Sequence, residues 1–423
     1  MKQYNEYKDS GVRWIGMVPE HWEIKKIRSL FKLSNQKTKD PNCTLLSLSQ
    51  YTGVRLKSEC ANVGMFEAET TIGYNIVQKG QFVMNIMLAW NGSYSVSNYN
   101  GVISPAYCVF DFIRNCDKKY FDYLLRLKAY SGAFKTLSKG LIDSRLRLYP
   151  EYFRTFPIVF PPVEEQNKIV AYLDEKISKI DKYISTAEKK IAALDELKQV
   201  TIADAVTHGI NPNAPMKDSE IPWIGMVPEH WIKLRAKNIF KRQFREVREN
   251  DDIVTCFRDG QVTLRKNRRR EGFTESLKEI GYQGIRKGDL VLHQMDAFAG
   301  SIGVSDSDGK GTPVYICCLP IGESNVYYYA YLLREMARTG FIKSLYRGIR
   351  ERSSDFRFET FSVQWLPVLP LSEQNEIVAY IDHKVAQIDK MKAAELAQID
   401  KLKEYKQRLI SDVVTGKVKV TNE

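Results

Sequence analysis

The chain lacks long apolar runs, paired cysteine spacings and secretion signals. Among its 423 residues no run of about 18 apolar residues occurs, so no membrane span is expected. The polar start "MKQYNEYKDSG" has no apolar core, so no signal peptide is expected. The seven cysteines are scattered without a CxxC spacing, which favours a reduced, cytoplasmic protein over a disulfide scaffold or a zinc site.

The common catalytic signatures are also missing. There is no GxxxxGK[ST] phosphate loop, no GxSxG and no HExxH, and the five histidines have no metal-ligand spacing. The Asn-Pro-Pro-aromatic tetrad of adenine amino-methyltransferases is absent, and "NPNAP" (211–215) reads as a linker. Acid-x-Lys triplets such as 23–25 are expected by chance in a chain that is 27% charged. The sequence therefore indicates no catalytic centre, no metal and no cofactor in this chain.

What the chain does have is an internal repeat. "WIGMVPEHW" occurs at Trp14–Trp22 and again at Trp223–Trp231. "YLLR" at Tyr123–Arg126 recurs at Tyr331–Arg334, and "EQNKIVAYLDEKISKIDK" (165–182) recurs as "EQNEIVAYIDHKVAQIDK" (373–390). A period this long indicates two duplicated domains rather than a solenoid. Because the nine-residue motif is apolar and aromatic, we expect it to be a packing anchor for two dissimilar inserts.

The net charge of +12 is concentrated in the divergent inserts. Residues 23–155 carry a net charge of +9 and residues 232–362 carry +7, whereas the matched segments are neutral or slightly acidic. The basic run "RDGQVTLRKNRRR" (258–270) mixes Arg and Lys with Gln and Asn, the side chains that pair with base edges. A solvated loop is the plain alternative for such a run alone, but the partition of charge in both copies favours a polyanion partner.

The closely matched segments predict two long helices. From 163 to 206 there is no Pro or Gly, and apolar residues recur at alternating spacings of three and four, the seam of a coiled coil. About 40 residues at ~1.5 Å each would give a helix of about 60 Å. In the second copy Lys392 and Glu395 interrupt the seam, so either its middle is polar or a register shift turns Met391 and Leu396 inward.

The simplest partner for one apolar stripe is the other, in an antiparallel pair; the alternative is that each helix packs only on its own domain. The predicted seam consists of Val170, Leu173, Ile177, Ile180, Ile184, Ile191 and Leu194, with Val378, Ile381, Val385, Ile388, Ile399 and Leu402.

Taken together, these motifs resemble the specificity subunits of Type I restriction–modification systems. The resemblance rests on "DSGVRWIGMVPEHW" and "DSEIPWIGMVPEHW", on the two "EQN…IVAY" helices, and on the endings "IADAVTHG" and "ISDVVTGK", and it covers the whole chain. It implies an α+β fold: two α/β globular target recognition domains joined by two long helices that form an antiparallel coiled coil, with a pseudo-two-fold internal repeat.

The expected division of the chain follows the repeat. It comprises an N-terminal motif (1–22), target recognition domain 1 (23–155), a central spacer with a long helix (156–222), the second motif with target recognition domain 2 (223–362), and a C-terminal spacer with a long helix (363–423).

The resemblance also implies a function. Each recognition domain would bind one half of a bipartite sequence in double-stranded DNA, and the helices would fix the gap between the halves. The chain itself would catalyse nothing. Two methyltransferase (modification) subunits would bind S-adenosylmethionine and methylate adenines, and restriction motor–nuclease subunits would bind ATP and Mg.

Residues expected to contact DNA are basic, amide or aromatic and fall in the divergent inserts. They are Gln50, Tyr51, Arg55, Trp90, Asn91, Lys139, Arg145 and Arg147 in the first copy, and Arg258, Arg265, Lys266, Arg268, Arg269, His293, Gln294, Arg347 and Arg350 in the second. Two other functions stay open. An autonomous nucleic-acid enzyme (a nuclease or fused methyltransferase) is disfavoured by the missing motifs, and a pure coiled-coil adaptor leaves the basic inserts unexplained.

Overall fold

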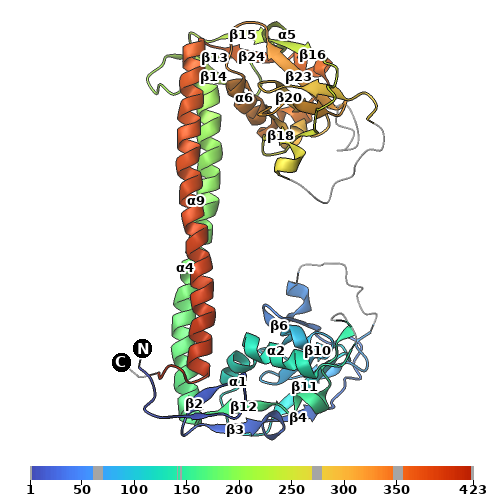
Figure 1. Ribbon diagram of the computed structural model, residues 1–423, viewed down its shortest axis with the longest axis vertical. Helices are drawn as coiled ribbons and strands as arrows, with labels where there is room; N and C mark the ends of the chain where they lie inside the picture. Colours follow the sequence, from blue (N-terminus) through green and yellow to red (C-terminus); the bar gives the residue numbers. More distant parts are fainter. Residues whose placement is uncertain are drawn as a thin grey trace. The chain divides into compact units, whose positions relative to one another are not determined.

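The computed structural model describes residues 2–60, 70–140, 142, 145–268, 279–345 and 356–420. The chain forms two compact units, one made of Met1–Ala187 with Ala397–Glu423 and the other of Glu188–Leu396. Each unit contains one recognition domain and one end of each long helix, α4 (Val163–His208) and α9 (Leu371–Val414) (Figure 1). The unit boundaries therefore cut across both helices.

The first recognition domain is built on a four-stranded antiparallel sheet of order β4-β11-β8-β9. Its strands are β4 (Phe31–Ser34), β8 (Phe82–Asn85), β9 (Tyr94–Val96) and β11 (Tyr107–Phe112). Two antiparallel strand pairs flank the sheet: the hairpin of β5 (Leu46–Ser49) with β6 (Gly53–Leu56), and the non-consecutive strands β7 (Asn75–Val77) and β10 (Gly101–Ile103). Short helices follow at α1 (Lys118–Leu125), α2 (Lys128–Leu137) and α3 (Pro150–Phe153).

The second recognition domain repeats this plan element by element. Its sheet, β16-β23-β20-β21, uses β16 (Phe240–Gln243), β20 (Leu290–His293), β21 (Ile302–Val304) and β23 (Tyr315–Pro320). The flanking pairs are the hairpin of β17 (Val254–Cys256) with β18 (Val262–Leu264) and the non-consecutive strands β19 (Gln283–Ile285) and β22 (Gly309–Gly311). The helices are α5 (Ala236–Ile239), α6 (Val326–Arg338), α7 (Phe341–Ser344) and α8 (Phe358–Ser362). The two inserts thus share a fold that their dissimilar sequences do not reveal.

Aromatic side chains fill the core of the first domain, whereas aliphatic ones dominate the second. Phe31, Phe82 and Phe153 are fully buried and stack on one another, with Phe82 and Phe153 rings 5.7 Å apart and nearly parallel. The core of the second unit is built around Leu290, Leu292 and Leu333. Because the interior must be filled in both, one backbone plan is satisfied by two different sets of side chains.

The nine-residue motif is a packing anchor, as expected. Trp22 and Trp231 are almost completely buried, and each indole N–H donates to a carboxylate in the first turn of a long helix: Glu165 for Trp22 and Glu373 for Trp231, both at 3.0 Å. The neighbouring histidine contacts the same carboxylate, His230 to Glu373 at 2.7 Å. The motif is repeated because each copy fastens its own domain to the same helix signature.

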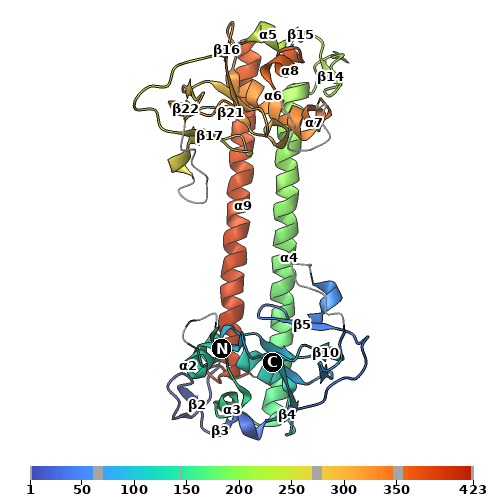
Figure 2. The ribbon, with the colours of Figure 1, turned by 90° about the vertical axis from the view of Figure 1, so that its right-hand side faces the viewer.

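Short strands complete each end. In the first unit β1 (Tyr7–Asp9) pairs with β2 (Met17–Pro19), and β3 (Glu23–Lys26) pairs with β12 (Pro157–Phe160). The second unit repeats this with β13 (Met216–Asp218), β14 (Met226–Pro228), β15 (Ile232–Arg235) and β24 (Trp365–Val368). The chain termini lie side by side in the first unit, where the Lys419 N–H donates to the Lys2 carbonyl at 2.9 Å (Figure 2).

The two long helices pair antiparallel within each unit. In the first unit Lys406 of α9 bonds Asp181 of α4 at 2.6 Å, and in the second Lys198 of α4 bonds Asp389 of α9 at 2.8 Å. None of the thirteen predicted seam residues is exposed: Leu173 and Ile381 are fully buried, whereas Ile184 and Ile191 are half-buried. The prediction of an antiparallel pair is confirmed, and packing of each helix on its own domain alone is wrong.

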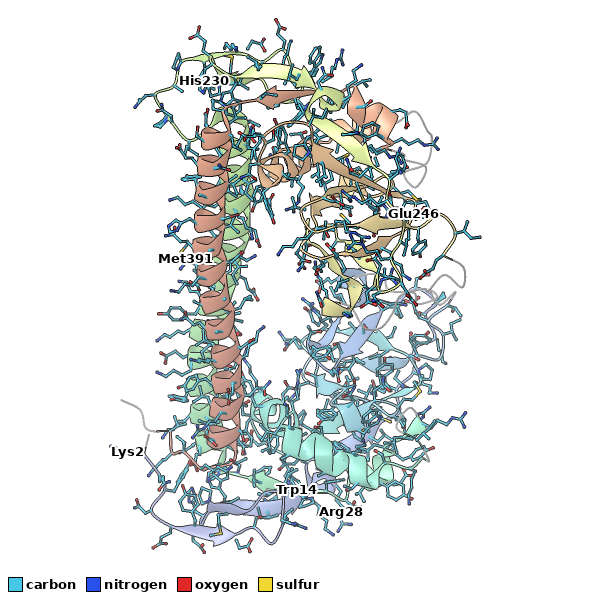
Figure 3. The ribbon with its side chains drawn as sticks, turned by 45° about the horizontal axis from the view of Figure 1, so that its top comes forward. Lys2, Trp14, Arg28, His230, Glu246 and Met391 are labelled. Carbon is cyan, nitrogen blue, oxygen red and sulfur yellow. The ribbon has the colours of Figure 1, made fainter. Side chains whose placement is uncertain are left out.

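The polar interruption of the second helix is accommodated without a register shift. Lys392 pairs with Asp195, and Glu395 pairs with Lys190 at 2.5 Å. Met391 and Leu396 remain 44% and 51% exposed, and Figure 3 shows Met391 on the outer side of α9. Of the two alternatives open from the sequence, the polar middle is therefore correct.

Candidate nucleic-acid interface

The first group of predicted contact residues lies on equivalent hairpin turns. Hairpin turn 1 (residues 50–52) joins β5 to β6 and carries Gln50 and Tyr51, with Arg55 exposed on β6. Hairpin turn 2 (residues 257–261) joins β17 to β18 and carries Arg258. Tyr51 is 82% exposed and the Arg258 side chain 67% exposed. One scaffold therefore presents different side chains to solvent at the same place in the two copies.

The second group lies on the short helical turn η3 (Ala89–Asn91). The indole N–H of Trp90 donates to the Met87 carbonyl at 3.1 Å, and the Lys135 ammonium lies 5.2 Å from the ring centroid. Trp90 is therefore half-buried and partly structural, whereas Asn91 is exposed. The equivalent turn in the second copy is η6 (Ala297–Ala299), where Phe298 replaces the tryptophan.

The structure brings the third group of the first domain next to the second. Lys139 and Arg147 are bonded to each other through their backbones at 2.8 and 2.9 Å, and Leu148 N–H donates to the Ile86 carbonyl at 3.0 Å, just before η3. Arg145 is exposed on the same loop. The Lys139 ammonium lies 5.2 Å from the Tyr152 ring, and Arg147 is half-buried.

Among the described cations of the basic run in the second domain, Arg258, Lys266 and Arg268 are paired with carboxylates. Lys266 bonds Asp252 at 2.5 Å, and Arg268 bonds Asp259 at 2.6 Å. Arg265 is half-buried, and its Nε donates to Thr255 at 3.3 Å. These contacts orient the cations and make the local electrostatic potential less positive than the sequence alone suggests. Arg269, Arg347 and Arg350 lie outside the described residues.

His293 and Gln294, at the end of β20, have internal partners. The Asp296 N–H donates to His293 Nδ1 at 3.2 Å, and burial lowers the pKa of His293, which favours the neutral imidazole. Gln294 donates to the Pro313 carbonyl at 3.3 Å. A neutral, half-buried histidine is a weak phosphate ligand. His293 and Gln294 therefore contribute to the local structure and add no positive charge to the surface.

Two relevant residues were missed by sequence reasoning. Asp296, which precedes η6, accepts a hydrogen bond from Arg258 at 3.0 Å and so orients the exposed arginine of hairpin turn 2. Arg126, in the repeated "YLLR", donates to the carbonyls of Gln50 and Tyr51 at 2.9 and 3.1 Å. The exact repetition of "YLLR" within divergent inserts was the available signal for Arg126; nothing in the sequence indicated Asp296.

The described residues hold no obvious reaction centre. They contain no group of three or more His, Cys, Asp or Glu side chains placed to hold a metal ion. Burial raises the pKa of Cys108 and of Cys317 to about 12, so these thiols are poor nucleophiles near neutral pH. No described helix is long and apolar enough to cross a bilayer.

The first copy of the duplicated scaffold is similar to a known DNA specificity domain. Residues 19–194, which include the first recognition domain and much of its long helix, match the family model of the Type I restriction modification DNA specificity domain. The second half repeats the same motifs and the same elements in the same order. Residues 19–194 are therefore similar to the Type I restriction modification DNA specificity domain, and the second half of the chain carries the same motifs in the same order.

The chain is also similar to a curated relative and, in fold, to two solved structures. The chain is 26% identical over 231 residues to the Type I restriction enzyme MjaVIII specificity subunit of Methanocaldococcus jannaschii; the alignment covers 52% of this chain and spans half the length of that relative. In fold it is similar to a chain from a solved structure of the type I R-M system, with a TM-score of 0.65, 14% identity and 94% and 98% coverage of the two chains. It is also similar to the HsdS subunit from Thermoanaerobacter tengcongensis, with a TM-score of 0.53, 14% identity and 95% and 98% coverage.

Proposed function

We propose that this chain is the sequence-specificity component of a Type I restriction–modification complex. Each recognition domain binds one half of a bipartite target in double-stranded DNA, and the antiparallel helices set the gap between the halves. The observation that carries this proposal is one recognition scaffold built twice, with different exposed side chains at equivalent turns. Two non-identical domains on one pseudo-symmetric frame suit two non-identical half-sites on a duplex.

The chemistry belongs to the partners in this proposal. Two methyltransferase subunits bind S-adenosylmethionine, flip the target adenine out of the duplex and methylate it. Motor–nuclease subunits that use ATP and Mg cut unmodified DNA. This chain contributes recognition alone, through Lys and Arg contacts to phosphates and a few contacts to base edges. It acts in the cytoplasm, where the genome lies.

A genome-wide methylation map, made with and without the gene, tests the proposal. We expect loss of one bipartite motif that carries methyladenine in both halves, with a gap of about one turn of duplex or less. The rival function, an autonomous nuclease or methyltransferase, predicts metal- or S-adenosylmethionine-dependent activity of the purified chain alone. If that activity appears and the map is unchanged in cells that express the whole system, the proposal is wrong.

A further inference from the structure

The repeated "YLLR" motif links the long helices to the hairpin turns. Its tyrosine fastens each recognition domain to its helix: the Tyr123 hydroxyl donates to Asp174 of α4, and the Tyr331 hydroxyl donates to Asp382 of α9, both at 2.7 Å. The two contacts occupy equivalent places in the two copies. The first residue of the motif therefore fixes α1 or α6 against the element that sets the gap.

The arginine at the other end of the motif supports the hairpin turn. Arg126 donates to two carbonyls of hairpin turn 1, at Gln50 and Tyr51. The guanidinium of Arg334 packs under hairpin turn 2, where a Cβ added to Gly260 would lie 2.6 Å from Arg334 Nη1. Each hairpin turn is thus held at a defined place relative to a long helix. Such rigid support is what base readout requires.

The side chains displayed on this common support differ in hydrogen-bonding chemistry. Hairpin turn 2 presents the Arg258 donor fork beside the Asp296 carboxylate, 3.0 Å apart and both accessible to solvent. At the equivalent positions the first copy has Gln50, a half-buried amide, and Leu88, an apolar side chain that is 42% exposed. Phosphate contacts carry no sequence information, so duplicated domains would keep them alike. A difference in hydrogen-bonding chemistry at the exposed tips is expected of base contacts.

We propose, resting on the function above, that these two pairs determine one base pair in each half-site. Arg258 donates to guanine O6 and N7 while Asp296 accepts from the N4 amino group of the paired cytosine. Gln50 pairs with adenine N6 and N7 while Leu88 contacts the methyl group of the paired thymine. Arg126 and Arg334 are positioning residues that hold the two hairpin turns.

The test is the methylation motif of cells that carry the complete system with Arg258→Gln. We expect one G·C position of one half-site to become relaxed or to change to A·T, with the other half-site unchanged. Arg248→Gln is the matched control: Arg248 is 66% exposed in the same domain and pairs with Asp308 at 3.2 Å, but it lies away from the hairpin turn. This variant keeps the wild-type motif.

Binding measurements cover the case in which the variant no longer supports methylation. The purified complex is titrated with duplexes substituted at each G·C pair of the half-site. The wild-type complex loses roughly 5- to 150-fold in affinity at the position read by Arg258, and the Arg258→Gln complex loses this discrimination there alone. Retention of every wild-type penalty by the variant overturns the inference while leaving the proposed function intact. Absence of any bipartite preference in the wild-type complex overturns the proposed function instead.

The positioning role has a separate readout. Arg126→Lys keeps the charge but cannot donate to both carbonyls of hairpin turn 1. We expect relaxed specificity at one position of the other half-site, with hydrogen exchange of β8 and β11 unchanged. Unchanged specificity with unchanged hydrogen exchange would show that Arg126 does not position the turn.

Discussion

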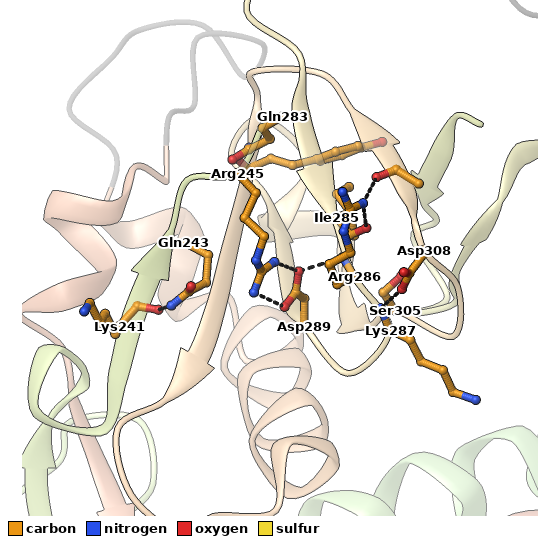
Figure 4. Close-up of polar contacts among 12 residues, drawn as sticks. Lys241, Gln243, Arg245, Gln283, Ile285, Arg286, Lys287, Asp289, Ser305 and Asp308 are labelled. Carbon is orange, nitrogen blue, oxygen red and sulfur yellow. Dashed lines mark hydrogen bonds and ion pairs between the residues drawn. The ribbon is translucent and has the colours of Figure 1, made fainter. Parts of the chain in front are cut away.

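The second recognition domain contains a buried ion pair that the first lacks. Its contribution to the free energy of unfolding can be measured by exchanging the side chains at these equivalent positions. Asp289 is 1% exposed, and its carboxylate pairs with Arg245 and accepts the backbone N–H of Arg286 at 2.8 Å (Figure 4). In the first copy the equivalent residues are Gln36 and Gln81; Gln81 accepts the backbone N–H of Gln78 and donates to the Asp111 carboxylate, both at 2.6 Å. The same backbone therefore accommodates an ion pair at these two positions in one copy and two neutral glutamines in the other.

Asp289→Gln should destabilise the second domain strongly. The variant keeps an acceptor for the Arg286 N–H but leaves the Arg245 guanidinium without its carboxylate. Removing one partner of a fully buried pair costs roughly 3–5 kcal/mol. Because the Arg245 side chain is 25% exposed, part of this is recovered by solvent, and we expect a loss of about 2–3 kcal/mol in the free energy of unfolding.

Hydrogen exchange followed by mass spectrometry gives this loss domain by domain. Protection of β19 and β20 should fall by roughly 30- to 150-fold, since each 1.4 kcal/mol is about tenfold. Peptides from β8 and β11 serve as an internal reference and should not change. The exposed pair Arg248–Asp308 gives the matched control, because Asp308→Asn removes a solvated ion pair and keeps an amide oxygen that can accept the Lys287 N–H.

The double variant Arg245→Gln with Asp289→Gln decides whether the reasoning is right. It places glutamine at both positions, as in the first domain, and should recover most of the lost protection, because no unpaired charge remains. If the double variant is as unstable as Asp289→Gln, the cost lies in packing around the longer glutamine and not in the orphaned charge. The electrostatic account would then be refuted.

Two further predictions concern the helix pair and pH. Replacing both Lys392 and Glu395 with Leu should raise the melting temperature of the helices followed by circular dichroism, because their partners Asp195 and Lys190 are already half-exposed and need no counterion; a lower melting temperature would show that the ion pairs stabilise the middle of the seam. His293 has a folded-state pKa below its unfolded value of about 6.5, so protonation favours the unfolded domain and stability should fall as the pH drops below about 6.5. His293→Asn, which copies Asn85 of the first domain, should flatten this dependence in hydrogen exchange of β20, and an unchanged pH profile would assign it to another group.

The long helices and the packing role of the nine-residue motif could be predicted from the sequence. The helices show a local spacing of apolar residues, and the motif occurs twice. The alternating spacing of apolar residues fixed the seam, and identity of the nine-residue motif pointed to a shared packing role that the burial of Trp22 and Trp231 confirms. Choosing between a polar seam and a register shift required the partner helix, since only the positions of Asp195 and Lys190 make Lys392 and Glu395 tolerable. Cross-helix pairing has no signature within one segment.

The recognition domains were harder to predict because their information is distributed. Burial of β8 and β20 requires apolar side chains but not particular ones, so Phe82 and Leu290 serve the same place. Basic residues were the visible signal, yet the carboxylates that restrain them, Asp252, Asp259 and Asp296, are distant in sequence or indistinguishable from ordinary surface acids. The predicted contact residues remain predictions until base preferences are measured.

Repetition separates what the scaffold requires from what each copy may vary. Contacts kept in both copies lie at the joints: Trp to Glu at the helix start and Tyr to Asp along the helix. Contacts that differ lie at the tips of the hairpin turns and in the interior pair at Asp289 and Gln81. Replacing a side chain in the Trp–Glu or Tyr–Asp contacts would move the domain relative to the helix. Replacing an exposed side chain of a hairpin turn requires no such movement. Under the proposed function, new sequence preferences arise at the tips while the helix contacts that position each domain stay constant.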